Sequence, residues 1–390
     1  MGSPRIGIVG AGPGGLVAAR ILSMHGKDVT VFERESSFSD RSQGGSLDIH
    51  ADAGQIALQK AGLIDEFLKI ARYADQEGRL YDKHGTLRHL DTDVAGKDRP
   101  ETDRGHLRKM LLDSLPTGTL RWGTAIAGVT PRGHGYAVKF ADGTEEEFDL
   151  IVGADGTWSK VRPVLSNAMP KYTGVLVIEF GIDKVEQRYP DTAAMAGRGL
   201  TFALGDSKAI VAHRDANEHM GGYVGLRVPE NWFQTNGLDR LDAHNSREAL
   251  CSEFTGWSED LLLWIRRSEG PLVPRPIYEL PAGHCWEHRE GITLVGDAAH
   301  VMSPFGGDGA NLAMLDGANL AEAFLQSDWR VAVEQFERSM CVRAEGPARS
   351  ASQAIQDVFS PQGLEHSLQW IPVQEAQRKM EPRELDRSRG

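Results

Sequence analysis

The chain has 390 residues, of which 40% are hydrophobic and 25% charged, as expected for a soluble globular protein with room for two layered domains. Its net charge of −12 disfavours a general nucleic-acid-binding surface, because phosphate contacts need a basic one. No apolar run reaches the roughly 18 residues of a membrane span, and the N-terminus leads directly into a predicted strand with no signal peptide. We therefore expect a cytoplasmic monomer without nucleic-acid or membrane partners.

Cysteine and histidine spacing excludes two further classes of protein. Cys251, Cys285 and Cys341 are far apart and form no C-x-x-C pair, which favours free thiols in a reducing compartment over a disulfide framework. The thirteen histidines show no metal-binding spacing, so no metal site is expected.

Apolar periodicity predicts alternating strands and helices in the first part of the chain. The expected elements are a strand at 6–9, a glycine turn at 10–15, a helix at 16–25, a strand at 29–32, helices at 51–68 and 104–115, hairpin strands within 118–148, and a buried strand at 150–152. Such a β-α-β start predicts a mostly parallel sheet covered by helices.

The pattern changes after residue 171, where longer strands separated by turns are typical of a second sheet. The elements expected from there are strands within 171–228, a helix at 246–267, a strand at 292–295, a helix from 311 and a final helical region at 329–359. The polar tail that starts at Pro372 is expected to be disordered.

The first motif is the glycine turn itself. Gly10 permits a tight turn, Gly12 lets the backbone approach a pyrophosphate, and Gly15 lets helix and strand pack closely. Glu33 closes the next strand, where an acid accepts hydrogen bonds from an adenosine ribose. An acid at this position suits FAD or NAD better than NADP.

Two later motifs each follow a buried strand. Asp155 lies in the Gly-Ala-Asp-Gly sequence after the strand at 150–152, and Asp297 begins Asp-Ala-Ala-His after the strand at 292–295. Asp297 could bind the hydroxyls of a ribityl chain, and the helix N-terminus that follows could stabilise negative charge at the flavin N1/C2 edge. The residues of that loop and helix start that we expect to bind the cofactor are Pro304, Gly307, Gly309, Ala310 and Asn311.

Three motifs in this order resemble the single-component flavin monooxygenases with the para-hydroxybenzoate hydroxylase-like fold. The helix that starts at Arg104 is similar to that family's R-x-x-L-x-x-x-L helix, whose arginine lies on the FAD. Residues 44–50 and the stretch around Pro304 look especially like the tetracycline-inactivating members. The resemblance implies FAD contacts from Arg34, Asp48 and Arg104, in addition to Glu33 and Asp297, and an NADPH contact from Arg41.

The resemblance also implies the fold class and its division into domains. We expect an α/β fold: a Rossmann-like FAD-binding domain of the GR2 type, an inserted mixed β-sheet substrate domain and a C-terminal bridging helix. The expected bounds are 1–73, 102–170 and 281–325 for the FAD domain, 74–101 and 171–280 for the substrate domain, 326–371 for the bridging helix and 372–390 for the polar tail.

The chemistry implied by the family needs no catalytic side chain. NADPH would reduce FAD, and O2 would then form a flavin C4a-hydroperoxide that delivers oxygen to an aromatic substrate. The protein would position the substrate and keep water away.

Substrate choice is expected to reside in the second sheet. Strand alternation places Leu176, Ile178, Phe180 and Ile182 on a covered face, so Glu179 should point from the opposite face toward the flavin pocket. Tyr223 is the corresponding candidate on a neighbouring strand. Tetracycline-inactivating enzymes carry glutamine and histidine near these two positions, and the other interpretation of Glu179 is a solvated strand acid.

Asp308 is a second departure from the family pattern, because related enzymes usually carry an uncharged residue there. We favour an N-cap for the following helix over a negative charge placed beside the flavin.

The leading functional hypothesis is NADPH- and O2-dependent hydroxylation of a polycyclic aromatic or enolic compound, such as a tetracycline-type antibiotic. Hydroxylation of another aromatic polyketide or phenol is one alternative. The others are a flavin reductase that does not activate oxygen and a flavoprotein that only sequesters an aromatic ligand.

Overall fold

The computed structural model describes residues 4–40, 44–73, 76–92, 99–216 and 218–380. The chain divides into two compact units that are both discontinuous in sequence. Unit 1 comprises Met1–Arg72, Pro100–Thr173 and Pro276–Ile355, and unit 2 comprises Tyr73–Arg99, Gly174–Arg275 and Gln356–Gly390. The chain therefore leaves unit 1 three times and returns to it twice.

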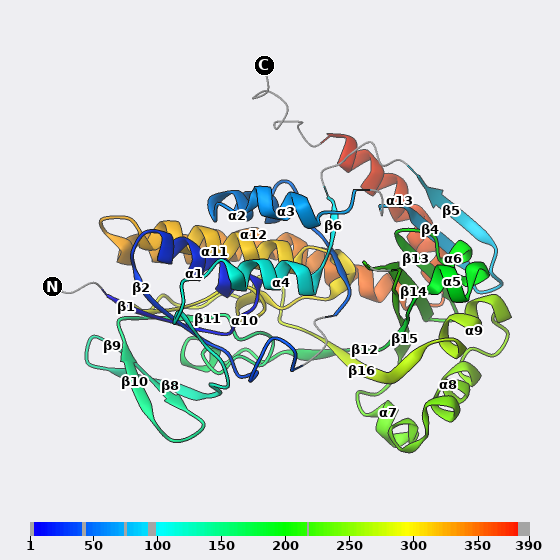
Figure 1. The fold of residues 1–390 in the computed structure, drawn as a ribbon, viewed down its shortest axis with the longest axis horizontal. Helices are drawn as coiled ribbons and strands as arrows, with labels where there is room; N and C mark the ends of the chain where they lie inside the picture. Colours follow the sequence, from blue (N-terminus) through cyan, green and yellow to red (C-terminus); the bar gives the residue numbers. More distant parts are fainter. Residues whose placement is uncertain (1–3, 41–43, 74–75, 93–98, 217, 381–390) are drawn as a thin grey trace. The chain divides into compact units, whose positions relative to one another are not determined.

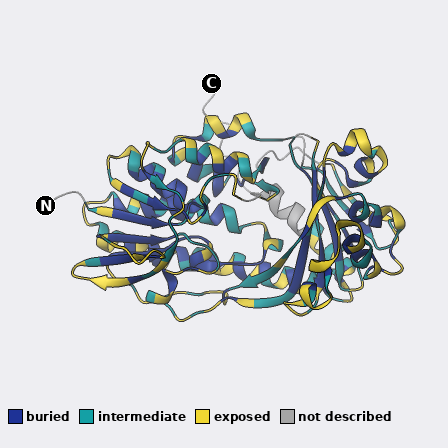
Figure 2. Cartoon of the chain, turned by 60° about the horizontal axis from the view of Figure 1, so that its bottom comes forward, coloured by how far each residue is buried: buried dark blue, intermediate teal, exposed yellow. Residues whose placement is uncertain are grey.

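A five-stranded parallel sheet forms the centre of unit 1 (Figure 1). In spatial order its strands are β17 (Ile292–Leu294), β11 (Leu150–Gly153), β1 (Arg5–Val9), β2 (Asp28–Phe32) and β7 (Leu120–Arg121). All neighbouring pairs are parallel. Four of these strands, β1, β2, β11 and β17, are buried over most of their length, which is why they are largely apolar in sequence (Figure 2).

Helices and two small sheets complete unit 1. The helices are α1 (Pro13–Met24), α2 (Gly54–Lys60), α3 (Ile64–Ile70), α4 (Arg104–Asp113), α10 (Asp297–His300), α11 (Gly309–Phe324) and most of α12 (Trp329–Val358), with short 3-10 turns at Arg162–Val164 and Pro304–Gly306. The small sheets are β10-β9-β8 (Glu145–Phe148, Gly135–Phe140 and Ile126–Arg132) and β3-β6 (Ser46–Asp48 and Glu101–Asp103). Helices α1 and α11 pack backbone to backbone, since a Cβ on Gly317 would lie 2.1 Å from the carbonyl oxygen of Gly14.

Unit 2 is built on a seven-stranded mixed sheet. In spatial order its strands are β16 (Glu269–Glu279), β12 (Lys171–Ile182), β15 (Met220–Arg227), β14 (Lys208–Arg214), β13 (Leu200–Gly205), β4 (Gly78–Asp82) and β5 (Leu87–Asp91). The β4–β13 pair is parallel. The β12–β15, β15–β14 and β14–β13 pairs are antiparallel. Its helices are α5 (Val185–Arg188), α6 (Pro190–Ala196), α7 (Trp232–Thr235), α8 (Ala243–Ser252), α9 (Glu259–Arg266) and α13 (Gly363–Met380), with a 3-10 turn at Leu238–Arg240.

The alternation predicted for β12 is confirmed. Leu176, Ile178, Phe180 and Ile182 are all buried and join one hydrophobic core with residues of α8 and α9. Glu179 is only partly buried on the other face of the strand.

Three predicted segments differ from the observed ones. The helix expected at 51–68 is broken into α2 and α3 at Gly62, whose φ of 68° is left-handed and ends a helix. The helix expected at 246–267 is likewise split into α8 and α9, with Gly256 at a φ of 84° between them. The expectation that the chain is disordered from Pro372 is wrong up to Met380, because α13 continues to that residue.

The expectation that all three thiols are free is also wrong. Cys285 and Cys341 form a disulfide, and only Cys251 is a free thiol. Linear spacing could not show this pair, because 56 residues of chain separate two positions that the fold brings together.

The predicted fold class is confirmed, since a parallel sheet with helices accompanies a separate mixed sheet. Among the described residues, no helix is both long enough and apolar enough to cross a membrane.

Candidate functional site

The three sequence motifs meet at one edge of the unit 1 sheet. The glycine turn follows β1, Asp155 follows β11 and Asp297 follows β17. These three strands are parallel neighbours, so their carboxyl ends lie at the same edge. Open α/β sheets bind their ligands at that edge.

Two glycines of the first motif are required by packing, and one is not. Gly10 has a φ of 102°, and a Cβ there would lie 2.3 Å from the carbonyl oxygen of Ala154. A Cβ on Gly15 would lie 2.5 Å from the carbonyl oxygen of Gly10. The nearest atom to a Cβ on Gly12, by contrast, would be 3.8 Å away. Packing leaves room for a side chain at Gly12, whereas close approach of a pyrophosphate would not.

The N-terminus of α1 is suited to an anion. The helix begins at Pro13 with Gly12 as its N-cap, and its first turn contains no acidic residue. Its first backbone N–H groups and its dipole therefore present positive charge beside Gly12.

Glu33, the predicted ribose acceptor, is held by protein contacts on both carboxylate oxygens. One oxygen accepts from the backbone N–H of Ala11 at 3.1 Å and from the guanidinium of Arg108 at 3.2 Å, and the other accepts from the N–H of Glu35 at 3.1 Å. Arg108 also donates to the carboxylate of Glu35 at 2.7 Å and to the carbonyl oxygen of Ala11 at 3.1 Å. A carboxylate has about four acceptor positions, so these contacts leave capacity for ribose hydroxyls.

Arg108 and Glu35 were missed by sequence reasoning, although both are buried beside the glycine turn. The available signal was position, because Arg108 lies one helical turn after Arg104 on α4.

The other residues predicted around the adenosine half differ in exposure. Arg34 and Arg104 are exposed, and Arg104 is the first residue of α4. Gly44 approaches Arg104 closely, since a Cβ there would lie 3.3 Å from its Cδ. Arg41, the predicted NADPH contact, lies outside the described residues.

Asp155, in the second motif, has a buried carboxylate oxygen that could accept a hydrogen bond from a ligand. Its Oδ2 accepts from the N–H of Lys160 at 2.6 Å, but its Oδ1 is buried with no hydrogen-bond partner in the described part of the chain. Burial raises the pKa of this carboxyl. An unpaired buried acceptor is costly, so a donor group from a ligand fits this position.

The second and third motifs are tied together by Arg162. This buried side chain donates to the carbonyl oxygen of Thr157 at 2.7 Å and to that of Ala298 at 3.1 Å. Thr157 follows the Gly-Ala-Asp-Gly sequence and Ala298 belongs to α10, so one arginine fixes the spacing of the two loops.

Asp297 begins α10 directly after the left-handed residue Gly296, whose φ is 59°. Its side chain has exposed surface, although the surrounding protein desolvates it and raises the pKa of its carboxyl. The positive charges of His300 and Arg104 oppose that rise. Asp297 and Arg104, from distant parts of the sequence, are therefore close enough to interact electrostatically.

A buried charge cluster supports the segment Gly296–His300, here called the Asp297 loop, which includes α10. Sequence reasoning also missed this cluster. Asp316 on α11 hydrogen-bonds Nε2 of His300 at 2.6 Å, the N–H of Gly296 at 3.1 Å and the guanidinium of Arg343 at 2.7 Å. Burial opposes charge on His300, but Asp316 outweighs it and the pKa of His300 is raised. His300 and Arg343 hold the pKa of Asp316 low against the effect of burial. The loop conformation thus depends on α11 and α12.

Asn311, a predicted cofactor residue, uses its side chain within the protein. Its amide nitrogen donates to the carbonyl oxygen of Asp48 at 2.9 Å, and its amide oxygen accepts from the N–H of His50 at 2.9 Å. The carboxylate of Asp48 in turn contacts Nε2 of His50 at 2.9 Å. These contacts join the start of α11 to the end of β3, which places Asp48 beside the predicted flavin loop.

The backbone at the start of α11 is accessible to a ligand. Pro304 is exposed, Gly307 has a φ of 79°, and a Cβ on Gly309 would be 3.9 Å from its nearest neighbour. Gly307 is exposed, and Gly309 and Ala310 are partly exposed.

The N-cap interpretation of Asp308 is right in position and wrong in contact. Asp308 is the N-cap residue of α11, but its side chain makes no capping hydrogen bond. Its carboxylate lies 3.8 Å from Nδ1 of His50 instead. This carboxylate therefore does not cap the first N–H groups of α11, which remain available to another acceptor.

Unit 2 gives Glu179 a partner that the sequence did not indicate. Its carboxylate lies 3.2 Å from Nε of Arg275 on β16, and Tyr223 is directly opposite it on β15. Burial raises the pKa of the Tyr223 hydroxyl. Glu179 is therefore neither a free anion nor a fully solvated one, and its place in a flavin pocket stays a prediction.

The residues at the sheet edge fit FAD. Two helix N-termini, an unpaired buried acceptor on Asp155 and glycines with free space at Gly12 and Gly309 are the features that a dinucleotide with two phosphates and many hydroxyls requires. In the described part of the chain, no group of three or more His, Cys, Asp or Glu side chains could hold a metal ion.

Comparison with known proteins agrees with this geometry. The profile of the FAD binding domain family matches residues 4–213 and 286–327, more than half of the chain. Monooxygenase asqM of Emericella nidulans is 33% identical over 82% of this chain and 83% of its own. The 6-hydroxynicotinate 3-monooxygenase of Pseudomonas fluorescens is 26% identical over 96% of this chain and 93% of its own.

The particular likeness to tetracycline-inactivating enzymes holds for the fold. The crystal structure of tetracycline destructase Tet(51) matches with a TM-score of 0.70, covering 97% of this chain and 98% of its own, at 19% identity. The monooxygenases named above are more similar in sequence. From the motifs at one sheet edge and these matches together, the chain is an FAD-dependent oxidoreductase that belongs to the flavin-dependent aromatic monooxygenase family.

Proposed function

We propose that this protein hydroxylates an electron-rich phenolic or enolic ring in a reaction that consumes NADPH and O2. Polycyclic compounds, tetracycline-type antibiotics among them, are the substrates we expect. The observation that carries the substrate class is the group formed by Glu179, Arg275 and Tyr223 in unit 2. It combines a guanidinium, a carboxylate and a neutral phenol on adjoining strands.

The group would recognise a ring that carries ionisable oxygens. Arg275 supplies N–H donors to a phenolate or enolate oxygen, and Glu179 supplies an acceptor for a hydroxyl, amide or ammonium group. A tyrosine hydroxyl keeps its proton at neutral pH and can donate, and burial raises the pKa of Tyr223 further from that range. A tetracycline offers both an enolic amide edge for Arg275 and an ammonium for Glu179. A simpler phenol offers only the ionisable oxygen for Arg275.

Unit 1 would hold the cofactor through the residues at its sheet edge. FAD, reduced by NADPH, supplies the electrons with which O2 is activated. Asp297 would accept hydrogen bonds from the ribityl hydroxyls, Glu33 would accept them from the ribose, and the α1 N-terminus at Gly12 would bind the pyrophosphate. The N-terminus of α11 would stabilise negative charge at the N1/C2 edge of the reduced ring. Docking of NADPH by Arg41 remains a prediction.

Oxygen uptake measured with NADPH and a panel of phenols, enols and tetracyclines tests the proposal. Uptake matched by NADPH consumption and by a product with one added oxygen atom is the expected result. Reduction of the substrate without O2 would identify a reductase instead. Tight binding of an aromatic ligand with no NADPH consumption would identify a sequestering flavoprotein.

A further inference from the structure

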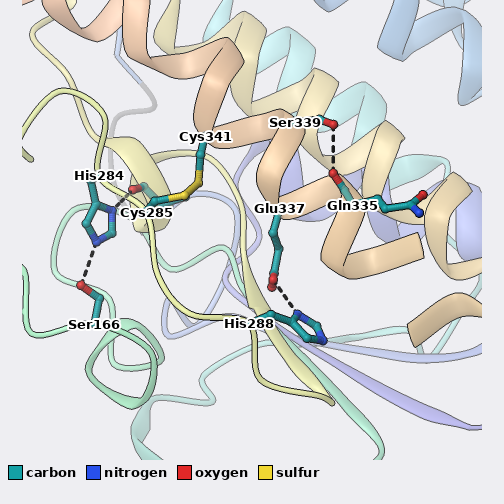
Figure 3. Close-up of a disulfide and its surroundings, with 9 residues drawn as sticks. Ser166, His284, Cys285, His288, Gln335, Glu337, Ser339 and Cys341 are labelled. Atoms are coloured by element: carbon teal, nitrogen blue, oxygen red, sulfur yellow. Dashed lines mark hydrogen bonds and ion pairs between the residues drawn. A yellow bond between two sulfur atoms is a disulfide. The ribbon is translucent and has the colours of Figure 1, made fainter. Parts of the chain in front are cut away.

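The disulfide joins two segments that both support the Asp297 loop. Cys285 lies between β16 and β17 and is exposed, and Cys341 lies on α12 and is partly exposed (Figure 3). Their Cα atoms are 5.7 Å apart. Both cysteines belong to unit 1, and Cys285 is the more exposed residue of the two.

The first segment reaches α10 through His284, the residue before Cys285. Nδ1 of His284 donates to the carbonyl oxygen of Ala299 at 2.6 Å, which leaves Nε2 to accept from the hydroxyl of Ser166 at 2.9 Å. Figure 3 shows the His284 imidazole beside the disulfide, with its contact to Ser166. The position of Cys285 is thus linked to the helix that Asp297 begins.

The second segment reaches the same loop through Arg343. Met340 and Ala344 form the buried stripe of α12 at this level, and helical spacing places Cys341 on one side of that stripe and Arg343 on the other. Arg343 donates to Asp316, which holds His300 and the N–H of Gly296. The disulfide and the Arg343 contact therefore fix the rotation of α12 from its two sides.

A small cavity shows that the two segments and the loop adjoin one another. His284, His300, Cys341 and Ala344 are among the residues that line it. Nδ1 of His300 is buried there without a hydrogen-bond partner among the described residues.

We propose that Cys285–Cys341 is a redox-modification site whose reduction weakens FAD binding by unit 1. Breaking the bond frees one side of α12 and the His284 segment together, so the Gly296–His300 loop loses two of its fixed supports. The inference rests on the proposed role of Asp297 as a ligand of the cofactor. Binding of FAD by the third motif would thus respond to thiols, although the disulfide lies outside that motif.

The step requires a reductant of the dithiol class. A thiolate of the dithiol attacks Sγ of Cys285, which belongs to the more exposed residue, and the Cys285–Cys341 bond breaks with Cys341 leaving as a thiolate that takes up a proton. The second thiol of the reagent then attacks the mixed disulfide and releases Cys285 as a thiol. Two electrons and two protons pass to the protein, and the reagent ends as its own disulfide.

The test compares FAD affinity of oxidised and dithiol-reduced apoprotein by fluorescence titration. We expect the Kd to rise about ten-fold on reduction, within the usual range of coupling between two sites. Cys285→Ser and Cys341→Ser should bind FAD like the reduced wild type and should not respond to the dithiol. Cys251→Ser is the matched control, because burial raises the pKa of that free thiol to about 11 and it takes no part in the bridge; it should respond like wild type.

Three outcomes would overturn the proposal. They are an unchanged Kd on reduction, alkylation of all three cysteines in protein purified without reductant, and complete unfolding on reduction, which would make the disulfide a structural staple. Failure of the cofactor assignment is distinguishable, because it would appear as unchanged FAD affinity in Asp297→Ala whatever the state of the disulfide.

Discussion

Asp297 offers the sharpest single-residue test of the cofactor site. Replacement by Ala should weaken FAD binding about ten- to hundred-fold, since a charge-assisted hydrogen bond contributes about 1.5–3 kcal/mol. Equilibrium titration of the apoprotein measures the change. Asp297→Asn, which keeps an acceptor, should lose less. A variant that stays yellow with unchanged affinity would show that the third motif does not bind the ribityl chain.

Gly12 separates the needs of the ligand from the needs of the fold. The Gly12→Ala apoprotein should unfold at nearly the temperature of the wild-type apoprotein, because the nearest atom to the added methyl group is 3.8 Å away. It should nevertheless bind FAD more weakly, since the methyl group occupies the approach to the pyrophosphate. Gly346→Ala on α12, where an added Cβ meets nothing within 4 Å, is the matched control for FAD affinity. Equal affinities in the two variants would contradict the prediction.

Glu179 tests the proposed substrate group. Glu179→Gln keeps length and acceptor capacity but leaves Arg275 without its counter-charge, so the substrate KM or the site of hydroxylation should change while FAD content does not. The change in KM should be about ten-fold, as for one charged hydrogen bond. Glu269→Gln is the control, because Glu269 is also a strand carboxylate that pairs with an arginine, Arg188, at similar exposure. Identical kinetics in both variants would place Glu179 among solvated strand acids.

Among the structural elements, the contact of α10, α11 and α12 around Asp316 predicts a pH dependence of stability. The folded-state pKa of His300 is raised above 6.5, so the charged pair with Asp316 stabilises the fold fully below that pH and this contribution is lost as pH rises through the folded value. The free energy of unfolding, measured in urea, should therefore fall more between about pH 6 and about pH 9 in wild type than in His300→Gln. His134→Gln, at an exposed turn, should follow wild type.

The same elements show what local sequence could and could not predict. The turn at Gly10–Gly15 and the strand alternation of β12 are fixed by neighbouring residues, so their patterns were sufficient. Gly62 and Gly256 carried the signal for two helix breaks that apolar periodicity alone concealed. Arg108 meets Glu33, and Arg343 meets Asp316, only after helices pack. No local sequence pattern predicts such pairs between distant segments, and the disulfide is one of them.

For the whole molecule, net charge predicts how FAD arrives. The chain carries −12 and FAD is itself an anion, so long-range repulsion should slow association at low ionic strength. Salt shortens the Debye length from about 30 Å at 0.01 M to about 8 Å at 0.15 M, and the association rate measured by stopped flow should rise accordingly. A rate that falls with salt would show that nearby cations such as Arg104 dominate the encounter.

The order of strands in unit 1 has a consequence for biosynthesis. β17 pairs with β11 through Ile151 and Ile292, and between these two strands the ribosome must make Gly174–Arg275, most of unit 2. A nascent chain that already contains the glycine turn and the Asp155 loop thus has an unpaired edge on β11. This edge stays unpaired until Ile292–Leu294 has been synthesised. Chaperones would have to shield that edge during the delay, and the vitamin-derived cofactor could be captured only near the end of translation. Chains released before Ile292 should accordingly aggregate or be degraded without ever acquiring colour.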